Sequence, residues 1–184
     1  MNVKYYLKNV DGLIIPTRAN KTDAGYDVTA TSGPKIIGVS YDPAYVSQSG
    51  KYRSIDYVEY ETNLYFVPSF GLHVKSETHF HTDLRPRSSI SSKTNFVMAN
   101  SIGLIDRGYH NQVLVRFKYV WQPMDFSDNG HNNEIEGKPN TEKMYKKGDK
   151  IAQILPMTTH NIDFQLIEFL PGEDRKGGFG STGN

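Results

Sequence analysis

An acid and an aromatic residue three positions apart, Asp106 and Tyr109, are the residues of this chain best suited by type to do chemistry. A carboxylate held in fixed geometry can act as a general base, and a neighbouring ring can bound the space in which a substrate lies. Apolar residues and a glycine lead into the acid in Asn100-Ser-Ile-Gly-Leu-Ile-Asp-Arg-Gly-Tyr109. An ordinary turn with a capping aspartate and a packing tyrosine has the same pattern, so this stretch alone leaves both interpretations open.

A strand with one apolar face must hold these two side chains. Apolar and basic residues alternate after Tyr109, with Arg116 and Lys118 on the face opposite to Val113, Val115, Phe117, Tyr119 and Trp121. The pattern predicts that the acid and the ring lie on a tight hairpin anchored by this strand.

A second segment has the composition of an anion site. In Leu84-Arg-Pro-Arg-Ser-Ser-Ile-Ser-Ser92, a proline precedes serines that can cap a short helix, and two arginines stand beside them. Arginines, hydroxyls and the free amides of a helix start together can bind phosphate. A plain capped turn with solvated arginines fits the residues equally well.

Three further polar features are candidates for a functional role. Asp27 follows a small Ala24-Gly25 step, and Gln153 stands among apolar residues in Gly148-Asp-Lys-Ile-Ala-Gln-Ile-Leu155. The tail Pro171–Asn184 is rich in glycine and could wrap an oxyanion, with a cation at Arg175 and a ring at Phe179. A buried aspartate, a glutamine bonded to backbone and a disordered terminus are the alternatives.

Bulk properties favour one soluble domain built from short strands. The chain has 184 residues, a net charge of +1, no cysteine, twelve tyrosines and nine phenylalanines. The balanced charge gives no general attraction to nucleic acid or membrane, so any anion site must be local. Without a membrane-length apolar run or a signal peptide, we expect an intracellular, by default cytoplasmic, protein.

Five segments in order resemble the motifs of the trimeric dUTP pyrophosphatase (dUTPase) family. They are Ala24-Gly-Tyr-Asp27, Pro86-Arg-Ser-Ser89, Gly103-Leu-Ile-Asp-Arg-Gly-Tyr109, Gly148-Asp-Lys-Ile-Ala-Gln153 and Gly177-Gly-Phe-Gly-Ser-Thr-Gly183. The resemblance implies an all-β fold, a distorted jelly-roll (β-clip) forming one domain over residues 1–184. It also implies a homotrimer with active sites at subunit interfaces and an exchanged, mobile C-terminal arm over 171–184.

The resemblance implies hydrolysis of dUTP to dUMP and pyrophosphate, with Asp106 as the general base that activates water for attack on the α-phosphorus. Tyr109 would stack on the deoxyribose and exclude a 2′-hydroxyl. The hairpin residues that would read uracil are Asn100, Gly103, Leu104, Ile105 and Leu114. The residues that would bind the phosphates are Arg87, Ser88, Ser89 and Gln153. The arm residues that would cover the base and the phosphates are Arg175, Gly178, Phe179, Gly180, Ser181 and Thr182. Mg²⁺ would be held by the three phosphates and waters, with Asp27 an indirect support through water.

Several features depart from the family pattern. His110-Asn111 replaces the usual Arg-Gly, and Arg175 lies one residue closer to Phe179 than is usual, which makes Lys176 a possible substitute. Two excursions, near 41–56 and 122–147, lengthen the chain between motifs. We expect them to be surface elaborations outside the catalytic core, possible docking sites for another protein.

Three rival functions remain from the sequence. A dCTP deaminase shares the fold and the Ile105–Tyr109 spacing, but needs a glutamate where this chain has Arg116. A catalytically silent trimeric regulatory protein would not need Asp106, Tyr109 and Gln153 together. A structural jelly-roll protein would leave the glycine-rich tail without a purpose.

Overall fold

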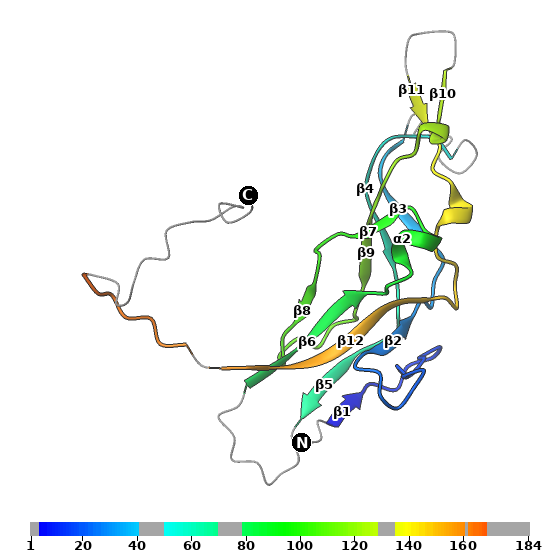
Figure 1. The fold of residues 1–184 in the computed structure, drawn as a ribbon. Coiled ribbons are helices and arrows are strands. Elements are labelled where there is room, and N and C mark those ends of the chain that lie inside the picture. The colour runs from blue at the N-terminus through cyan, green and yellow to red at the C-terminus, as the bar shows by residue number, and fades with distance from the viewer. Residues whose placement is uncertain (1–3, 41–49, 70–78, 129–134, 161, 169–184) are drawn as a thin grey trace.

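The structure, a computed structural model, describes residues 4–40, 50–69, 79–128, 135–160 and 162–168 (Figure 1). Short strands make up nearly all of its regular structure, which confirms the predicted all-β class. The strands are β1 (Lys4–Leu7), β2 (Tyr26–Thr29), β3 (Lys35–Ser40), β4 (Tyr52–Tyr60), β5 (Phe66–Ser69), β6 (His79–Pro86), β7 (Phe96–Met98), β8 (Gly103–Ile105), β9 (Val115–Tyr119), β10 (Phe126–Asp128), β11 (Ile135–Gly137) and β12 (Lys150–Thr159). The helical turns are α2 (Ile90–Lys93) and the 3₁₀ helices η1 (Pro123–Asp125) and η2 (Thr141–Lys143).

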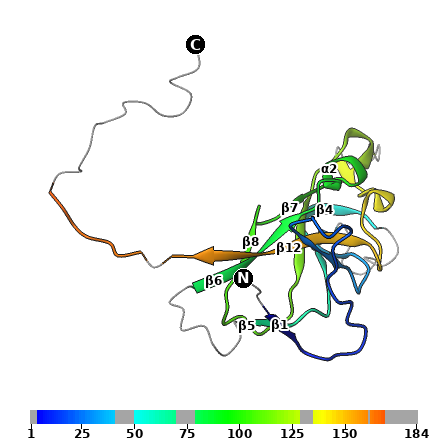
Figure 2. The ribbon, with the colours of Figure 1, turned by 60° about the horizontal axis from the view of Figure 1, so that its bottom comes forward.

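Two antiparallel sheets form the body (Figures 1 and 2). One has the strand order β2-β12-β6-β8, and the other runs β10-β11-β4-β9-β7 with β3 also paired to β4. A small third sheet pairs β1 with β5. In the first sheet, β12 lies between β2 and β6, so that Gln153 faces Asp27 on one side and Arg85 on the other.

The core lies where strands of the two sheets bring their apolar faces together. An aromatic cluster dominates it: the rings of Phe96 and Phe117 stack with centroids 5.1 Å apart, and Tyr60 and Tyr145 pack around them. On β9 the residues alternate between buried and exposed, which confirms the faces predicted for this strand. This rigid core fixes the ends of β8 and β9, between which the acid and the ring lie.

The predicted hairpin is wrong in its pairing. β8 pairs with β6, whereas β9 pairs with β4 and β7, so the two strands belong to different sheets. Alternation fixes which face of a strand is buried, but it does not specify the neighbouring strand. Asp106 and Tyr109 therefore lie on a connection that crosses between the sheets.

The two excursions meet at one end of the molecule, the top of Figure 1. Residues 52–56 of the first excursion lie in β4, and residues 41–49 lie outside the described residues. In the second excursion β10 and β11 pair, and Gly137 of β11 pairs with Tyr52 of β4. A Cβ at Gly137 would lie 2.7 Å from the Trp121 ring, which explains the glycine.

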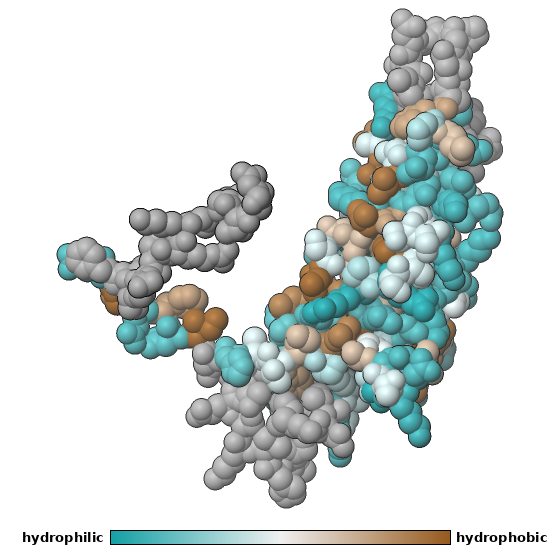
Figure 3. Space-filling model, viewed as in Figure 1, coloured by the Kyte–Doolittle hydropathy of each residue, from teal (hydrophilic) through white to brown (hydrophobic). Residues whose placement is uncertain are grey.

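Residues 162–168 extend away from the body after β12 (Figures 1 and 2). The apolar residues of Ile162–Phe169 favour a strand, but residues 162–168 form no strand in the structure. Phe164 is 88% exposed and Leu166 is fully exposed, because no part of the described chain covers them. Figure 3 shows this segment apart from the body, and apolar residues also dot the exposed edge of the body itself. No helix in the described ranges is long and apolar enough to cross a membrane.

Candidate active site

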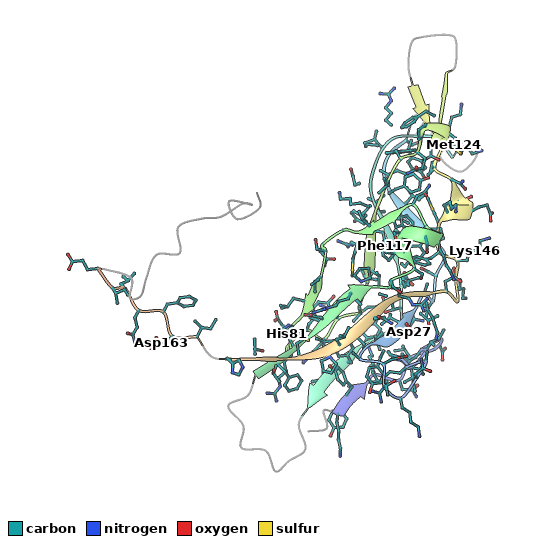
Figure 4. All side chains as sticks on the ribbon, in the orientation of Figure 1. Asp27, His81, Phe117, Met124, Lys146 and Asp163 are labelled. Atoms are coloured by element: carbon teal, nitrogen blue, oxygen red, sulfur yellow. The ribbon has the colours of Figure 1, made fainter. Side chains whose placement is uncertain are left out.

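Four polar residues converge where β2 and β12 run side by side. The carboxylate of Asp27 is 5% exposed; its Oδ1 accepts hydrogen bonds from Arg87 Nε and Gln153 Nε2, both at 3.1 Å. Its Oδ2 lies 2.9 Å from the ammonium of Lys150. The β2–β12 register sets Gln153 opposite Asp27, whose position Figure 4 labels, and Arg87 directly follows β6 in the chain. The sequence therefore identified three members of the cluster and missed the fourth, Lys150.

The glycine before Asp27 leaves room for the glutamine. A Cβ at Gly25 would lie 3.1 Å from Gln153 Oε1 and 3.2 Å from its Cβ. These distances are too short for an added methyl group unless the glutamine moves. The predicted close approach at the Ala-Gly step thus involves a side chain of the opposite strand.

The charge around Asp27 determines its ionisation. Burial by itself raises the pKa of this carboxyl group. The hydrogen bonds from Lys150 and Gln153 and the charges of Arg87 and Lys150 outweigh burial, so the pKa lies below its ordinary value. Asp27 is therefore ionised at neutral pH and bound to its cationic partners.

A basic cavity of about 230 Å³ adjoins this cluster at the start of α2. Its lining includes Arg87, Ser89, Lys93, Lys146 and Lys150. The sequence predicted the short helix correctly, and Ser89 is its N-cap residue. The serine side chain makes no cap hydrogen bond, however, and its buried Oγ has no partner among the described residues. Ser88 beside it is exposed.

The acid and the ring lie on the turn after β8. The amide of Tyr109 donates to the carbonyl of Asp106 at 3.0 Å, which closes the turn, and the tyrosine hydroxyl donates to the carbonyl of Gln112 at 3.0 Å. Tyr109 is 40% exposed, and Asp106 is exposed without an ion-pair partner within the described ranges.

A second cavity, of about 460 Å³, lies beside this turn. Three residues predicted to contact a nucleoside line it: Asn100, Tyr109 and Leu114. Of the β8 residues predicted with them, Gly103 and Ile105 are buried and Leu104 is 60% exposed, and none of the three lines the cavity.

The sequence missed the six other lining residues, which are Tyr57, Leu84, Met98, Ala99, Arg116 and Lys118. Arg116 lies 2.8 Å from Glu59 and 4.6 Å from the centre of the Tyr57 ring. The strand alternation had put Arg116 and Lys118 opposite the core, but only tertiary pairing of β9 with β4 reveals what they face.

Within one chain, the two halves of the predicted site stay apart. The nucleoside-side cavity and the basic cavity share no lining residue, and Asp106 lines neither. The predicted contacts from the arm lie outside the described residues: Arg175, Lys176, Gly178, Phe179, Gly180, Ser181 and Thr182.

No family model matches the chain, but comparison with known proteins finds relatives that share one name. The chain is 26% identical over 172 residues to the deoxyuridine 5′-triphosphate nucleotidohydrolase of Leptospira interrogans, covering 92% of this chain and 91% of that protein. It is 35% identical over 99 residues to the Aeromonas hydrophila protein of the same name, covering 53% of each.

Solved structures share the whole fold. A mutant dUTPase of Staphylococcus bacteriophage 80alpha with dUpNHpp superposes with a TM-score of 0.64 at 22% identity, covering 100% of this chain and 99% of that one. The dUTPase of phage phi11, described with a structural Mg(II) ion, superposes with a TM-score of 0.58 at 20% identity, covering 92% and 98%. The predicted jelly-roll fold is thereby confirmed.

Proposed function

The chain belongs to the dUTPase family, and we propose that it hydrolyses dUTP to dUMP and pyrophosphate. The observation that carries the proposal is the Asp27 cluster. It unites residues of three separate motif-like segments, Asp27, Arg87 and Gln153, in one hydrogen-bonded group. The fold thus brings polar side chains of three distant segments to one place, beside a cavity lined by four basic side chains.

We propose that Asp106 removes a proton from the water that attacks the α-phosphorus. An exposed carboxylate is a weak base, so its effect must come from its position and from exclusion of bulk water. A closing C-terminal arm would supply that exclusion. The ring of Tyr109 would pack against the sugar, in the cavity that it lines with Asn100 and Leu114.

The cationic cluster suits the triphosphate. Arg87 and Lys150 would offset the negative charge, while Gln153, Ser88 and Ser89 would donate hydrogen bonds to phosphate oxygens. The unpartnered hydroxyl of Ser89 supports this assignment, because a buried hydroxyl without a partner is costly unless a ligand satisfies it. The arm residues Arg175, Gly178, Phe179, Gly180, Ser181 and Thr182 would add contacts from above.

Mg²⁺ fits this site only as part of the nucleotide. The described residues contain no group of three metal-ligating side chains, and both oxygens of Asp27 are engaged by nitrogen donors. We infer that the phosphates and water would hold the ion. When bound there, Mg²⁺ would neutralise phosphate charge and draw electrons from the reacting phosphorus.

We propose a homotrimer in which different copies complete each site. Two observations support it. The nucleoside-side cavity and the basic cavity are separate within one chain. Residues 162–168 also expose the apolar side chains of Ile162, Phe164 and Leu166, which the described part of the chain does not cover. Several large apolar side chains exposed together on one short segment are typical of an interaction surface.

One assay tests the function. The full chain is incubated with dUTP and with dCTP in the presence of Mg²⁺, and pyrophosphate and ammonia are measured. We expect pyrophosphate from dUTP alone. Ammonia from dCTP would identify a deaminase, and nucleotide binding without either product would identify a silent binding protein. Either result contradicts the proposal.

A further inference from the structure

The carboxylate of Asp27 has little capacity left for a metal or its water. It accepts from Arg87 Nε and Gln153 Nε2 on one oxygen and contacts Lys150 Nζ on the other. A carboxylate offers about four lone-pair sites. Three are in use, and the side chain is almost completely buried. This does not fit the expected support of Mg²⁺ through water.

The three donors come from long side chains that would otherwise sample many rotamers. Arg87 also donates from Nη1 to the Lys150 carbonyl at 3.4 Å, so the arginine and the lysine are linked through main chain as well. Arginine and lysine lose much side-chain entropy when a ligand immobilises them. The bonds to Asp27 already fix all three side chains, so their entropy is lost before the ligand binds.

Lys150 adds a second positive charge to the cluster, beside that of Arg87. Its side chain is 43% exposed and lines the basic cavity beside Arg87 and Ser89. An ammonium group has three N–H donors, and Asp27 uses one side of it. The remaining donors can meet an anion in the cavity.

We propose that Asp27 is a positioning residue that presets Arg87, Gln153 and Lys150 for phosphate, and that Lys150 is a further phosphate-binding residue. The inference rests on the proposed function. It assigns the effect of Asp27 to preorganised donors, so Asp27 must matter before any metal is bound.

The test measures ligand affinity of the full chain in EDTA, with dUpNHpp and with deoxyuridine, which lacks phosphates. Asp27→Asn keeps the size of the side chain and removes its charge. We expect about 10- to 100-fold weaker binding of dUpNHpp, which is the loss found when a residue that orients a metal ligand is removed, because Asp27 orients its three donors in a similar way. Binding of deoxyuridine should not change, and neither should the Mg²⁺ concentration that gives half-maximal turnover.

A matched control is Asp83→Asn. Asp83 is an equally buried carboxylate of the same sheet, bonded to Arg85 at 2.7 Å and to His81 at 3.0 Å. It should lower thermal stability to a similar degree and leave dUpNHpp binding unchanged. Equal losses of dUpNHpp binding in both variants, or parallel loss of deoxyuridine binding, would mean that Asp27 merely holds the fold.

Lys150 is tested separately. Lys150→Met should weaken binding of dUpNHpp, and Lys150→Arg should restore most of it, whereas Lys35→Met, which removes an ion pair to Glu59 on the other sheet, should do neither. Unchanged dUpNHpp affinity with a raised Mg²⁺ requirement in Asp27→Asn would overturn the inference in favour of metal support. If the unaltered chain does not bind dUpNHpp at all, the proposed function fails first.

Discussion

Two aspartates of this chain have opposite surroundings, and these surroundings suit different tasks. Asp106 is exposed on a turn with no ion-pair partner in the described ranges, so it can accept a proton. Asp27 is buried beneath two cations and an amide that lower its pKa, which makes it a poor base at neutral pH. We therefore propose that the acid with fewer contacts, Asp106, is the catalytic base.

Replacement of Asp106 tests this division. Asp106→Asn keeps the size of the side chain and removes the base, so we expect turnover of dUTP to fall by about 10²–10⁴-fold. Binding of dUpNHpp and the melting temperature should stay near those of the unaltered chain. Pyrophosphate release and calorimetry measure both. Near-normal turnover would refute the assignment of the base.

At the scale of strands, the paired β2 and β12 carry Asp27, Lys150 and Gln153, which we propose to act on the phosphates. The packing of Gln153 between these strands depends on one glycine, Gly25. Gly25→Ala would put a methyl group 3.1 Å from Gln153 Oε1. We expect the glutamine to shift away from Asp27, with about a tenfold loss of kcat/KM and a destabilisation of about 1–3 kcal/mol from overpacking. Kinetics and denaturant unfolding measure these changes.

Gly33→Ala is the matched control for this variant, because its Cβ would meet no atom within 4 Å. It should change neither quantity. If Gly25→Ala proves as harmless as Gly33→Ala, the packing of Gln153 against Gly25 is unimportant for the site.

The β10–β11 pair lies at the opposite end of the molecule from Asp27, near Met124 in Figure 4. Replacing residues 126–137 by a short turn should leave dUTP hydrolysis intact. It should lower the melting temperature, since Trp121 packs on Phe126 and against Gly137. Steady-state kinetics and thermal unfolding test this, and loss of turnover would show that the excursion belongs to the catalytic core.

The sequence predicted side chains better than pairings. Val115, Phe117 and Tyr119 were assigned to the buried face correctly, because alternation depends only on the strand itself. The hairpin around Asp106 was wrong, since β8 pairs with β6 through contacts between residues far apart in the chain. Lys150 was missed for the same reason: its role depends on Asp27, more than a hundred positions earlier, and no local pattern marks it.

At the scale of the whole molecule, the chain is a body with an extended segment and two incomplete half-sites (Figure 1). Ordinary packing explains neither feature within one chain. A second copy that covers residues 162–168 would explain the exposed apolar row, and copies that share half-sites would complete the catalytic geometry.

Charges placed on the extended segment test the assembly. Phe164→Asp with Leu166→Asp should not unfold the body, because both side chains are exposed in the single chain. We expect the molar mass in solution to fall from three copies to one, and dUTP turnover to be lost with it. Light scattering and kinetics measure both. Asp163→Asn, in the same segment, is the control and should keep the trimer; a trimeric, active double variant would contradict the role of this segment.

The pairing of Gly137 in β11 with Tyr52 in β4 connects the two excursions. Neither is an independent appendage, because β4 supplies the neighbouring main chain for β11, and the Gly137 position lies tight against an indole ring. Grafting one of them onto a shorter relative would thus leave amide and carbonyl groups unpaired along a bare edge. Only the two transplanted jointly would be expected to fold.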